Sequence, residues 1–231
     1  MKSPMYGRFA KEYDRAVQDN IFNAMLERPS LQAMLPELKG KRVLDLACGS
    51  GVYAEYLLAQ GAEVTAVDVS PQMVEMVNEK LSGQLQCYVQ DLNQGLPKEA
   101  DGGYDLIICP LAVHYLPDLL PLFKDVQRCL VKGGVFVFST HHPLVDFEVS
   151  PSGNYFKREL ITEEWDTIGQ PVEVSFYRRS LTELFDAILL SGMSVSGLSE
   201  GKPAPEMANI DLQRFEQLST RPNFIFIKCQ N

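Results

Sequence analysis

The sequence predicts an α/β fold: a doubly wound, mainly parallel seven-stranded sheet that ends in a C-terminal antiparallel hairpin. Three observations predict it. Apolar, β-favouring runs alternate with helical segments as far as residue 139, which is the order that parallel crossover connections require. The first apolar run breaks directly into a glycine turn at residues 49–51. Two further β-like runs, at 193–198 and 223–228, come last in the chain.

The individual elements follow from periodicity and capping signals. Ser70-Pro71 marks one helix start, and Ser180 followed by Glu183 fits a capping box for another. We expect strands at 43–46, 63–68, 85–89, 104–109, 135–139, 193–198 and 223–228. We expect helices at 52–60, 71–81 and 118–131, the last stopped by Gly133-Gly134, and a helical segment over 6–38 that restarts at Pro29-Ser30.

Composition narrows the function classes. The 231 residues are 45% hydrophobic and 22% charged, which suits one globular domain. The net charge of −9 and the lack of any Lys/Arg cluster disfavour a nucleic-acid partner. No apolar run has the length of a membrane span or of a signal-peptide core. The five cysteines form no C-x-x-C pair, so we expect buried thiols in the cytoplasm and no metal site.

The glycine turn admits three interpretations. It could be a structural turn without a ligand. Gly49-x-Gly51-x-x-Ala54 also meets a relaxed form of the dinucleotide fingerprint. The third interpretation uses Asp45, which that fingerprint does not require. An apolar strand with an embedded acid, followed by x-x-x-Gly-x-Gly, resembles motif I of the class I S-adenosylmethionine (SAM) methyltransferases. The resemblance implies a Rossmann-like methyltransferase sheet and a cofactor contact by Asp45, Ala47, Gly49 and Gly51.

Two later strand ends extend the resemblance. Asp68 closes the second strand, where an acid can accept hydrogen bonds from both ribose hydroxyls of an adenosine; its alternative role is a helix N-cap. In the family, the residues after this acid flank the adenine, which makes Val69 and Met73 candidates. Residues Gln90, Asp91 and Leu92 resemble the adenine motif, in which the acid accepts from the exocyclic amine and the next backbone N–H reaches the ring. The alternative for Asp91 is a solvated loop acid.

The resemblance is less specific in the N-terminal helix and at the end of the fourth strand. Tyr13-Asp14 matches a "Tyr-Asp" helix that folds over SAM in small-molecule methyltransferases, with the tyrosine hydroxyl at the methionine carboxylate. The alternative is a helix that only packs on the sheet. Cys109 ends the fourth strand, in the region next to the reactive methyl. This region lacks the Pro-Pro-aromatic signature of amino-methylating DNA enzymes and the acid of metal-dependent catechol-type enzymes, so both subclasses are disfavoured.

The domain organisation is expected to be a single methyltransferase domain over residues 1–231. Residues 1–38 would form N-terminal cover helices, 40–140 the SAM-binding core, and 179–231 the C-terminal part of the sheet. Within residues 141–178, periodicity is lost from 144 to 176, and this stretch is rich in aromatic side chains. We interpret them as a substrate-cover insertion with two short antiparallel strands near 155–160 and 172–177. The alternative is an oligomer contact, which leaves a homodimer open.

The resemblance implies an enzyme of the small-molecule branch, similar to quinone-biosynthesis methyltransferases, that moves the SAM methyl to an acceptor and releases S-adenosylhomocysteine. His114 and His141 lie at strand ends near the expected acceptor and are candidate bases, because imidazole titrates near neutral pH. The adjacent His142 would point the other way. The alternatives are a tRNA- or nucleic-acid-modifying methyltransferase, a nicotinamide-dependent reductase, and a non-catalytic SAM-binding protein.

Overall fold

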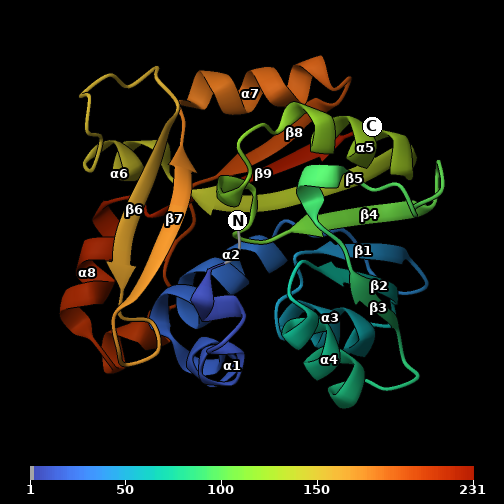
Figure 1. The fold of residues 1–231 in the computed structure, drawn as a ribbon, viewed down its shortest axis with the longest axis horizontal. Helices are drawn as coiled ribbons and strands as arrows, with labels where there is room; N and C mark the ends of the chain where they lie inside the picture. The colour runs from blue at the N-terminus through green and yellow to red at the C-terminus, as the bar shows by residue number, and fades with distance from the viewer. Residues whose placement is uncertain (1–2) are drawn as a thin grey trace.

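The computed structural model describes residues 3–231, and its centre is one seven-stranded sheet (Figure 1). The strand order is β3-β2-β1-β4-β5-β9-β8. The first five strands in the chain run parallel: β1 (Arg42–Leu46), β2 (Glu63–Asp68), β3 (Gln86–Val89), β4 (Tyr104–Cys109) and β5 (Leu130–His141). Strand β9 (Phe224–Gln230) is antiparallel to both β5 and β8 (Ser194–Ser199). The predicted fold class is confirmed.

Helices cover both faces of this sheet, as its continuous apolar strands require. Helices α3 (Val52–Ala59) and α4 (Pro71–Lys80) lie on one face, and α5 (Leu120–Cys129) and α7 (Leu181–Leu190) lie on the other (Figure 1). Side chains of β1 alternate between two cores: Val43 packs with the α3–α4 side, and Leu44 packs with the α5–α7 side. Among residues 3–231, no helix combines the length and apolar character needed to cross a membrane.

Two helix starts were predicted from capping residues, and both are confirmed. The Ser70 hydroxyl accepts a hydrogen bond from the Met73 amide at 3.3 Å, and the Ser180 hydroxyl accepts one from the Glu183 amide at 3.2 Å. Each serine thereby satisfies an amide that has no partner within its helix. These caps fix where α4 and α7 leave the strand ends.

The N-terminal segment contains the 3-10 turn η1 (Pro4–Tyr6), helix α1 (Ala10–Asp19), the π-helical turn η2 (Asn23–Glu27) and helix α2 (Arg28–Gln32). The predicted restart at Pro29-Ser30 is wrong, because the helix continues through Pro29. A proline cannot donate to the carbonyl four residues earlier, which here is Met25. The Ala204 amide donates to that carbonyl instead, at 2.6 Å. An amide from far along the chain therefore satisfies this carbonyl.

Strand β5 begins earlier than predicted. Gly133-Gly134 was expected to stop the preceding helix, but α5 ends at Cys129 and Leu130 already pairs with Tyr104 of β4. The register shifts between Tyr104 and the following residues of β4, and the two glycines lie in this irregular part of β5. A Cβ on Gly134 would lie 2.9 Å from the Val131 carbonyl oxygen, which explains glycine there.

The expected insertion contains a two-stranded antiparallel sheet, β6 (Glu159–Trp165) and β7 (Val172–Arg178), so the first strand lies later than predicted. It also contains α6 (Pro143–Phe147), which the sequence analysis missed. Strand β7 packs on the 3-10 turn η1, and α8 (Leu212–Thr220) packs on the 3-10 turn η5 (Pro205–Asn209). A third small core joins Met5 of η1 to Val172 and Val174 of β7. The N-terminal segment and the insertion thus pack together.

Candidate active site

A cavity of about 370 Å³ lies at the carboxyl ends of the parallel strands. Its walls come from the turn after β1, the ends of β2 and β4, the loop after β3, the N-terminal segment, and β7. The last two contribute Tyr6, Tyr13, Glu27, Glu173 and Ser175. In an open α/β sheet this edge is where ligands bind, so the cavity is the candidate active site.

Most of the predicted cofactor residues line this cavity. They are Tyr13, Asp45, Ala47, Gly49, Asp68, Val69, Asp91 and Leu92. The other four, Gly51, Met73, Gln90 and Cys109, are not among the lining residues, and each has a different environment. The side-chain amide of Gln90 donates to the carbonyls of Asp91 and Gly95, at 3.1 and 3.0 Å, and so shapes the loop behind the cavity.

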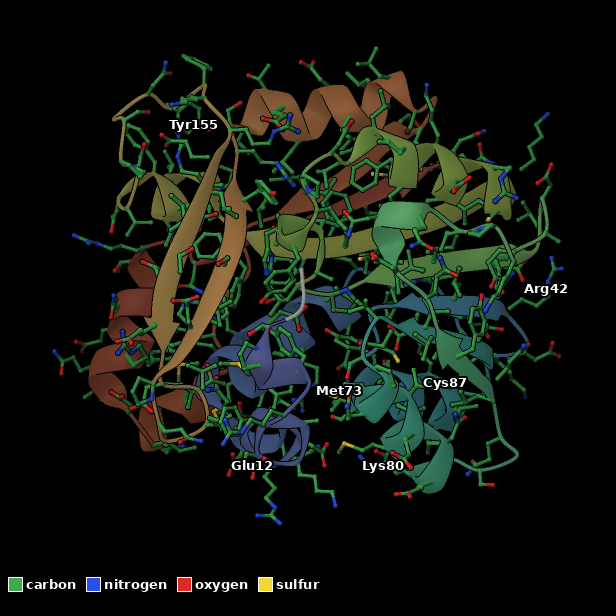
Figure 2. All side chains as sticks on the ribbon, viewed as in Figure 1. Glu12, Arg42, Met73, Lys80, Cys87 and Tyr155 are labelled. Carbon is green, nitrogen blue, oxygen red and sulfur yellow. The ribbon has the colours of Figure 1, made fainter. Side chains whose placement is uncertain are left out.

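The remaining three are packed into the protein. Gly51 has φ +86°, and a Cβ there would lie 3.0 Å from a Val77 methyl, so this glycine lets α3 and α4 approach. Met73 is fully buried on α4, on the side of the sheet that α3 and α4 cover (Figure 2). Cys109 is fully buried in the core beneath α5 and α7, where burial raises the pKa of its thiol.

Asp68 is held by backbone amides at the end of β2. Its carboxylate accepts hydrogen bonds from the amide of Gly49 at 2.9 Å and from that of Ser70 at 2.8 Å. Burial raises the pKa of Asp68, and the bonds from backbone amides oppose this shift. The cap of α4 is Ser70 and not Asp68, so the predicted alternative role for Asp68 is excluded.

Asp45 and Ser50 carry unpaired polar atoms. Asp45 is 0% exposed and yet lines the cavity, and neither of its carboxylate oxygens has a hydrogen-bond partner among the described residues. Ser50 lines the same cavity, and within residues 3–231 its buried hydroxyl is also without a partner. Burial, with smaller contributions from Cys87, Asp68 and Glu27, raises the pKa of Asp45 well above its usual value. Buried polar atoms are normally satisfied, so these point to a polar ligand.

Asp91 lies in the loop after β3, where its carboxylate accepts from the amide of Asn93 at 3.0 Å and from the Asn93 side chain at 2.8 Å. It thereby begins the 3-10 turn η3 (Leu92–Gln94) and lines the cavity beside Leu92. The acid is therefore fixed in orientation and only partly exposed.

Glu27 was missed by the sequence analysis. It is 3% exposed, lines the cavity, and accepts hydrogen bonds from the Tyr53 hydroxyl at 2.9 Å and the Ser139 hydroxyl at 2.6 Å. Burial raises its pKa to about 7, against the opposing effects of the two hydroxyls and of Arg28. The local sequence places Glu27 next to Arg28, between the apolar residues Leu26 and Leu31, which is an ordinary pattern for a surface helix.

Two tyrosines that the sequence analysis missed also close the cavity. The hydroxyls of Tyr6 and Tyr115 are 2.6 Å apart, and the Tyr6 ring meets Tyr13 edge-on at 4.9 Å between centroids. The carbonyl of Tyr6 accepts a hydrogen bond from the Ser70 hydroxyl at 2.6 Å. Tyr115 ends the 3-10 turn η4 (Val113–Tyr115) after β4. The N-terminal segment is thus tied to the ends of both β2 and β4.

The predicted bases His114 and His141 do not line the cavity. Their rings stack at 4.0 Å between centroids, and His141 lies edge-on to Phe176 of β7. The His114 ring contacts the Thr140 hydroxyl at 3.2 Å, and His141 Nδ1 lies 3.2 Å from the Asp146 carboxylate. Burial, with His141 and Arg179, lowers the pKa of His114 well below its usual value. The pair therefore joins the main sheet to the insertion, next to Tyr115.

His142 faces elsewhere, as expected for an adjacent residue on an extended segment. Its Nδ1 accepts the Leu144 amide at 3.2 Å and so begins α6, and its Nε2 is 2.9 Å from the Glu200 carboxylate. Within residues 3–231, no three His, Cys, Asp or Glu side chains are grouped to hold a metal ion. All five cysteines are buried and free.

Comparisons with known proteins agree with this geometry. Residues 44–138 match the model of a family described as a methyltransferase domain. The Bacillus subtilis protein YqeM, whose name assigns it provisionally to the methyltransferases, is 30% identical over 176 residues, which cover 74% of this chain and 70% of that protein. A ubiquinone biosynthesis O-methyltransferase of Xanthomonas campestris is 33% identical over 106 residues, which cover only 45% of this chain and 44% of that protein.

A solved structure shows the same relationship over a longer stretch. It is a protein of Listeria monocytogenes, titled provisionally as a SAM-dependent methyltransferase, with 27% identity and a TM-score of 0.74 over 87% of this chain and 94% of that one. These matches confirm the predicted activity and cofactor, and they set aside both the reductase and the non-catalytic SAM-binding protein. The chain belongs to the class I SAM-dependent methyltransferases.

Proposed function

We propose that the cavity holds SAM and that the enzyme transfers its methyl group to a small-molecule acceptor. The observation that carries this proposal is that two cavity-lining residues, Asp45 and Ser50, have buried side-chain oxygens without a partner within residues 3–231. A ligand with several N–H and O–H donors would satisfy them. SAM carries an ammonium group, an adenine amine and two ribose hydroxyls, so its chemistry fits these acceptors.

The cavity residues suit the parts of SAM as follows. Asp68 would accept hydrogen bonds from the ribose hydroxyls, since it is charged when ionised and already oriented by two amides. Asp91 and Leu92 would receive the adenine, with Val69 against the ring. Tyr13 would face the methionine half. Gly49 offers bare backbone at φ +54°, and no atom lies within 4 Å of the position a Cβ would occupy.

SAM supplies an electrophilic methyl group on a positively charged sulfur. The protein's part is to hold an acceptor in line with that methyl and to keep water away, and positioning alone can contribute several kcal/mol. Tyr6, Tyr115 and Glu173 line the cavity from segments outside the seven-stranded sheet. A cavity of about 370 Å³ bounded by several segments favours a small acceptor.

Charge also supports a small-molecule acceptor. The chain carries a net charge of −9, and acids such as Asp45, Asp68 and Glu27 line the cavity, so a phosphate backbone would be repelled. The match to a ubiquinone biosynthesis O-methyltransferase adds support within its limited coverage. The five free thiols support a cytoplasmic location, where thiols stay reduced.

We further propose that His114 and His141 orient the acceptor side of the cavity, since His114 is followed directly by the lining residue Tyr115. Replacing either histidine by alanine should lower turnover and leave the affinity for SAM nearly unchanged. An unchanged rate in both variants would remove this assignment.

The test of the function is methyl transfer itself. The purified protein is incubated with methyl-labelled SAM and a cell metabolite extract, with intact and digested RNA in parallel reactions. We expect label in a low-molecular-weight fraction, and none with Asp68→Ala. Label in RNA only would instead identify a nucleic-acid methyltransferase.

A further inference from the structure

Two of the five free cysteines meet beside the candidate active site. We propose that Cys48 and Cys87 form an intramolecular disulfide when a hydroperoxide enters the ligand-free cavity, and that this bond lowers the affinity for SAM and for S-adenosylhomocysteine (SAH). The effect on affinity rests on the proposed function, because it requires the cofactor to lie in this cavity. The disulfide itself does not depend on that function.

The first argument is position. Cys48 lies in the glycine turn after β1, and its amide donates to the Val67 carbonyl of β2 at 3.0 Å. Val67 is paired with Tyr88 of β3, and the preceding residue of β3 is Cys87 (Figure 2). Both cysteines belong to the core on the α3–α4 side of the sheet. A side-chain hydrogen bond joins their thiols, so the two sulfur atoms are neighbours in the reduced protein.

The second argument is the acidity of the two thiols. The hydrogen bond from the Cys48 thiol lowers the pKa of Cys87, against the opposing effects of burial and of Asp68. The same hydrogen bond, with burial and nearby acids, raises the pKa of Cys48 well above its usual value. The thiolate, and not the thiol, is the nucleophile toward a peroxide. Cys87 is therefore the thiol that reacts first, and Cys48 completes the disulfide.

The third argument is access. Cys48 lines the cavity, so a small hydroperoxide that enters there reaches the pair. Cys109, Cys129 and Cys229 are fully buried in the core beneath α5 and α7 and do not line the cavity. Burial raises the pKa of Cys129 to about 11 and that of Cys229 to about 12. Among the five cysteines, the pair at Cys48 therefore combines a neighbouring thiol with a route for the oxidant.

The reaction balances with one molecule of hydrogen peroxide. The Cys87 thiolate attacks a peroxide oxygen, the O–O bond breaks, and the departing hydroxide takes up the proton that Cys87 released, which gives a sulfenic acid and water. The Cys48 sulfur then attacks the Cys87 sulfur. The S–O bond breaks, and the oxygen leaves as a second water with the proton of Cys48. The thiols together lose two electrons, which the peroxide gains.

The new bond would displace the glycine turn. A disulfide holds its sulfur atoms about 2.0 Å apart, which is closer than two hydrogen-bonded thiols, so Cys48 would be drawn toward β3. The next residue, Gly49, donates its amide to the Asp68 carboxylate at 2.9 Å. A shift of the turn would disturb this bond, and with it the acid proposed to hold the ribose.

The test exposes the ligand-free protein to hydrogen peroxide and then denatures it in N-ethylmaleimide. We expect three alkylated cysteines in place of five, and a peptide in which Cys48 is joined to Cys87. Calorimetry should show a Kd for SAH about tenfold higher than before oxidation, as for the loss of one charged hydrogen bond, and a dithiol reductant should restore it. Saturating SAH during the exposure should slow the loss of thiols.

Two variants complete the test. Cys87→Ala lacks the reactive thiol, so it should bind SAH as the wild type does and keep that affinity after peroxide. Cys87→Ser takes its place if the alanine variant does not fold. The matched control, Cys229→Ala, loses a buried free thiol from the other core. It should form the bond between Cys48 and Cys87 and lose affinity like the wild type.

Other outcomes overturn the inference. Five alkylated cysteines after exposure, or a disulfide between another pair, would show that these thiols do not react together. Loss of SAH affinity in oxidised Cys87→Ala would assign the effect to a different residue, and a disulfide with unchanged SAH affinity would remove the effect on the site. Failure of the proposed function is distinguishable, because the untreated wild type would then bind neither SAM nor SAH, while the thiol count would still report on the pair.

Discussion

The backbone amide of Gly49 donates a hydrogen bond of 2.9 Å to the carboxylate of Asp68, and this bond joins the glycine turn after β1 to the end of β2. The amide of Ser70 holds the second oxygen of the same carboxylate at 2.8 Å. The acid and the turn are therefore oriented relative to each other before a ligand arrives, which lowers the entropy lost on binding.

Replacing Asp68 by asparagine should weaken cofactor binding. An amide oxygen can still accept one backbone bond, but the negative charge and the second acceptor are lost. We expect the Kd for SAH to rise about ten- to hundredfold by calorimetry, together with a lower Tm, because one backbone amide loses its acceptor. The exposed Asp166→Asn is the matched control. Unchanged SAH affinity in Asp68→Asn would contradict the ribose assignment.

The two turn glycines should respond differently to alanine. Gly51→Ala forces a Cβ to 3.0 Å from the Val77 side chain at φ +86°, so we expect a loss of about 1–3 kcal/mol and a Tm several degrees lower. At Gly49 the new methyl meets no atom of the protein within 4 Å, and the left-handed φ alone costs about 1 kcal/mol.

Gly49→Ala should instead lose affinity for SAH, because its methyl group would occupy cavity space. Thermal unfolding with and without SAH separates the two effects: ligand should raise the Tm of Gly51→Ala and barely raise that of Gly49→Ala. The reverse pattern would show that Gly49 does not face the cofactor.

Glu27 should make stability fall as pH rises. Its pKa in the folded protein is about 7 and its ordinary value is 4.5, so between these pH values the folded state keeps a proton that the unfolded state releases. The free energy of unfolding therefore declines by about 1.4 kcal/mol per pH unit in this window, roughly 3 kcal/mol in all. Urea unfolding at pH 5 and pH 8 measures it.

The comparison variant for this pH effect is Glu27→Gln, which has no proton to lose. The groups that face Glu27 are the Tyr53 and Ser139 hydroxyls and the guanidinium of Arg28, with Asp45 and Tyr13 also in its electrostatic range. The stability of the wild type relative to Glu27→Gln should drop between pH 5 and pH 8. A constant difference would place the pKa of Glu27 outside this window.

The contact between Tyr6 and Tyr115 should slow the release of product. Tyr6→Phe removes the hydrogen bond between the two hydroxyls, which is worth about 1 kcal/mol, while the ring still packs on Tyr13. We expect SAH to dissociate roughly fivefold faster in stopped-flow displacement. A dissociation rate equal to that of the wild type would show that this contact does not restrain the ligand.

The order of elements and the glycine turn could be predicted because their signals are local. An apolar run, a capping serine or a glycine turn carries its meaning within a few residues, and Asp68, Asp91 and Gly49 occupy strand ends that such signals locate. Cys109 was expected next to the reactive methyl, but its side chain lies in the core beneath α5 and α7. Neighbouring residues of a strand point to opposite faces, so an error of one residue changes the face.

Glu27, Tyr6 and Tyr115 could not be found in the same way. Each reaches the cavity through packing between segments far apart in the sequence: Glu27 through Ser139, and Tyr6 through Tyr115. The Met25 carbonyl, which Pro29 cannot satisfy, depends in the same way on a distant amide. The nearby sequence alone does not show that these side chains reach the cavity.

The bond from Ala204 to the Met25 carbonyl ties the turn that carries Glu27 to a segment near the C-terminus. Gly201 reinforces this junction, since a Cβ there would collide with Phe226 at 2.7 Å and with the Ser30 hydroxyl at 2.9 Å. Neither Ala204 nor Gly201 lines the cavity. Substitutions at residues 201–204 should therefore displace Glu27 and lower the activity. Such changes would inactivate the enzyme from a position that does not line the cavity.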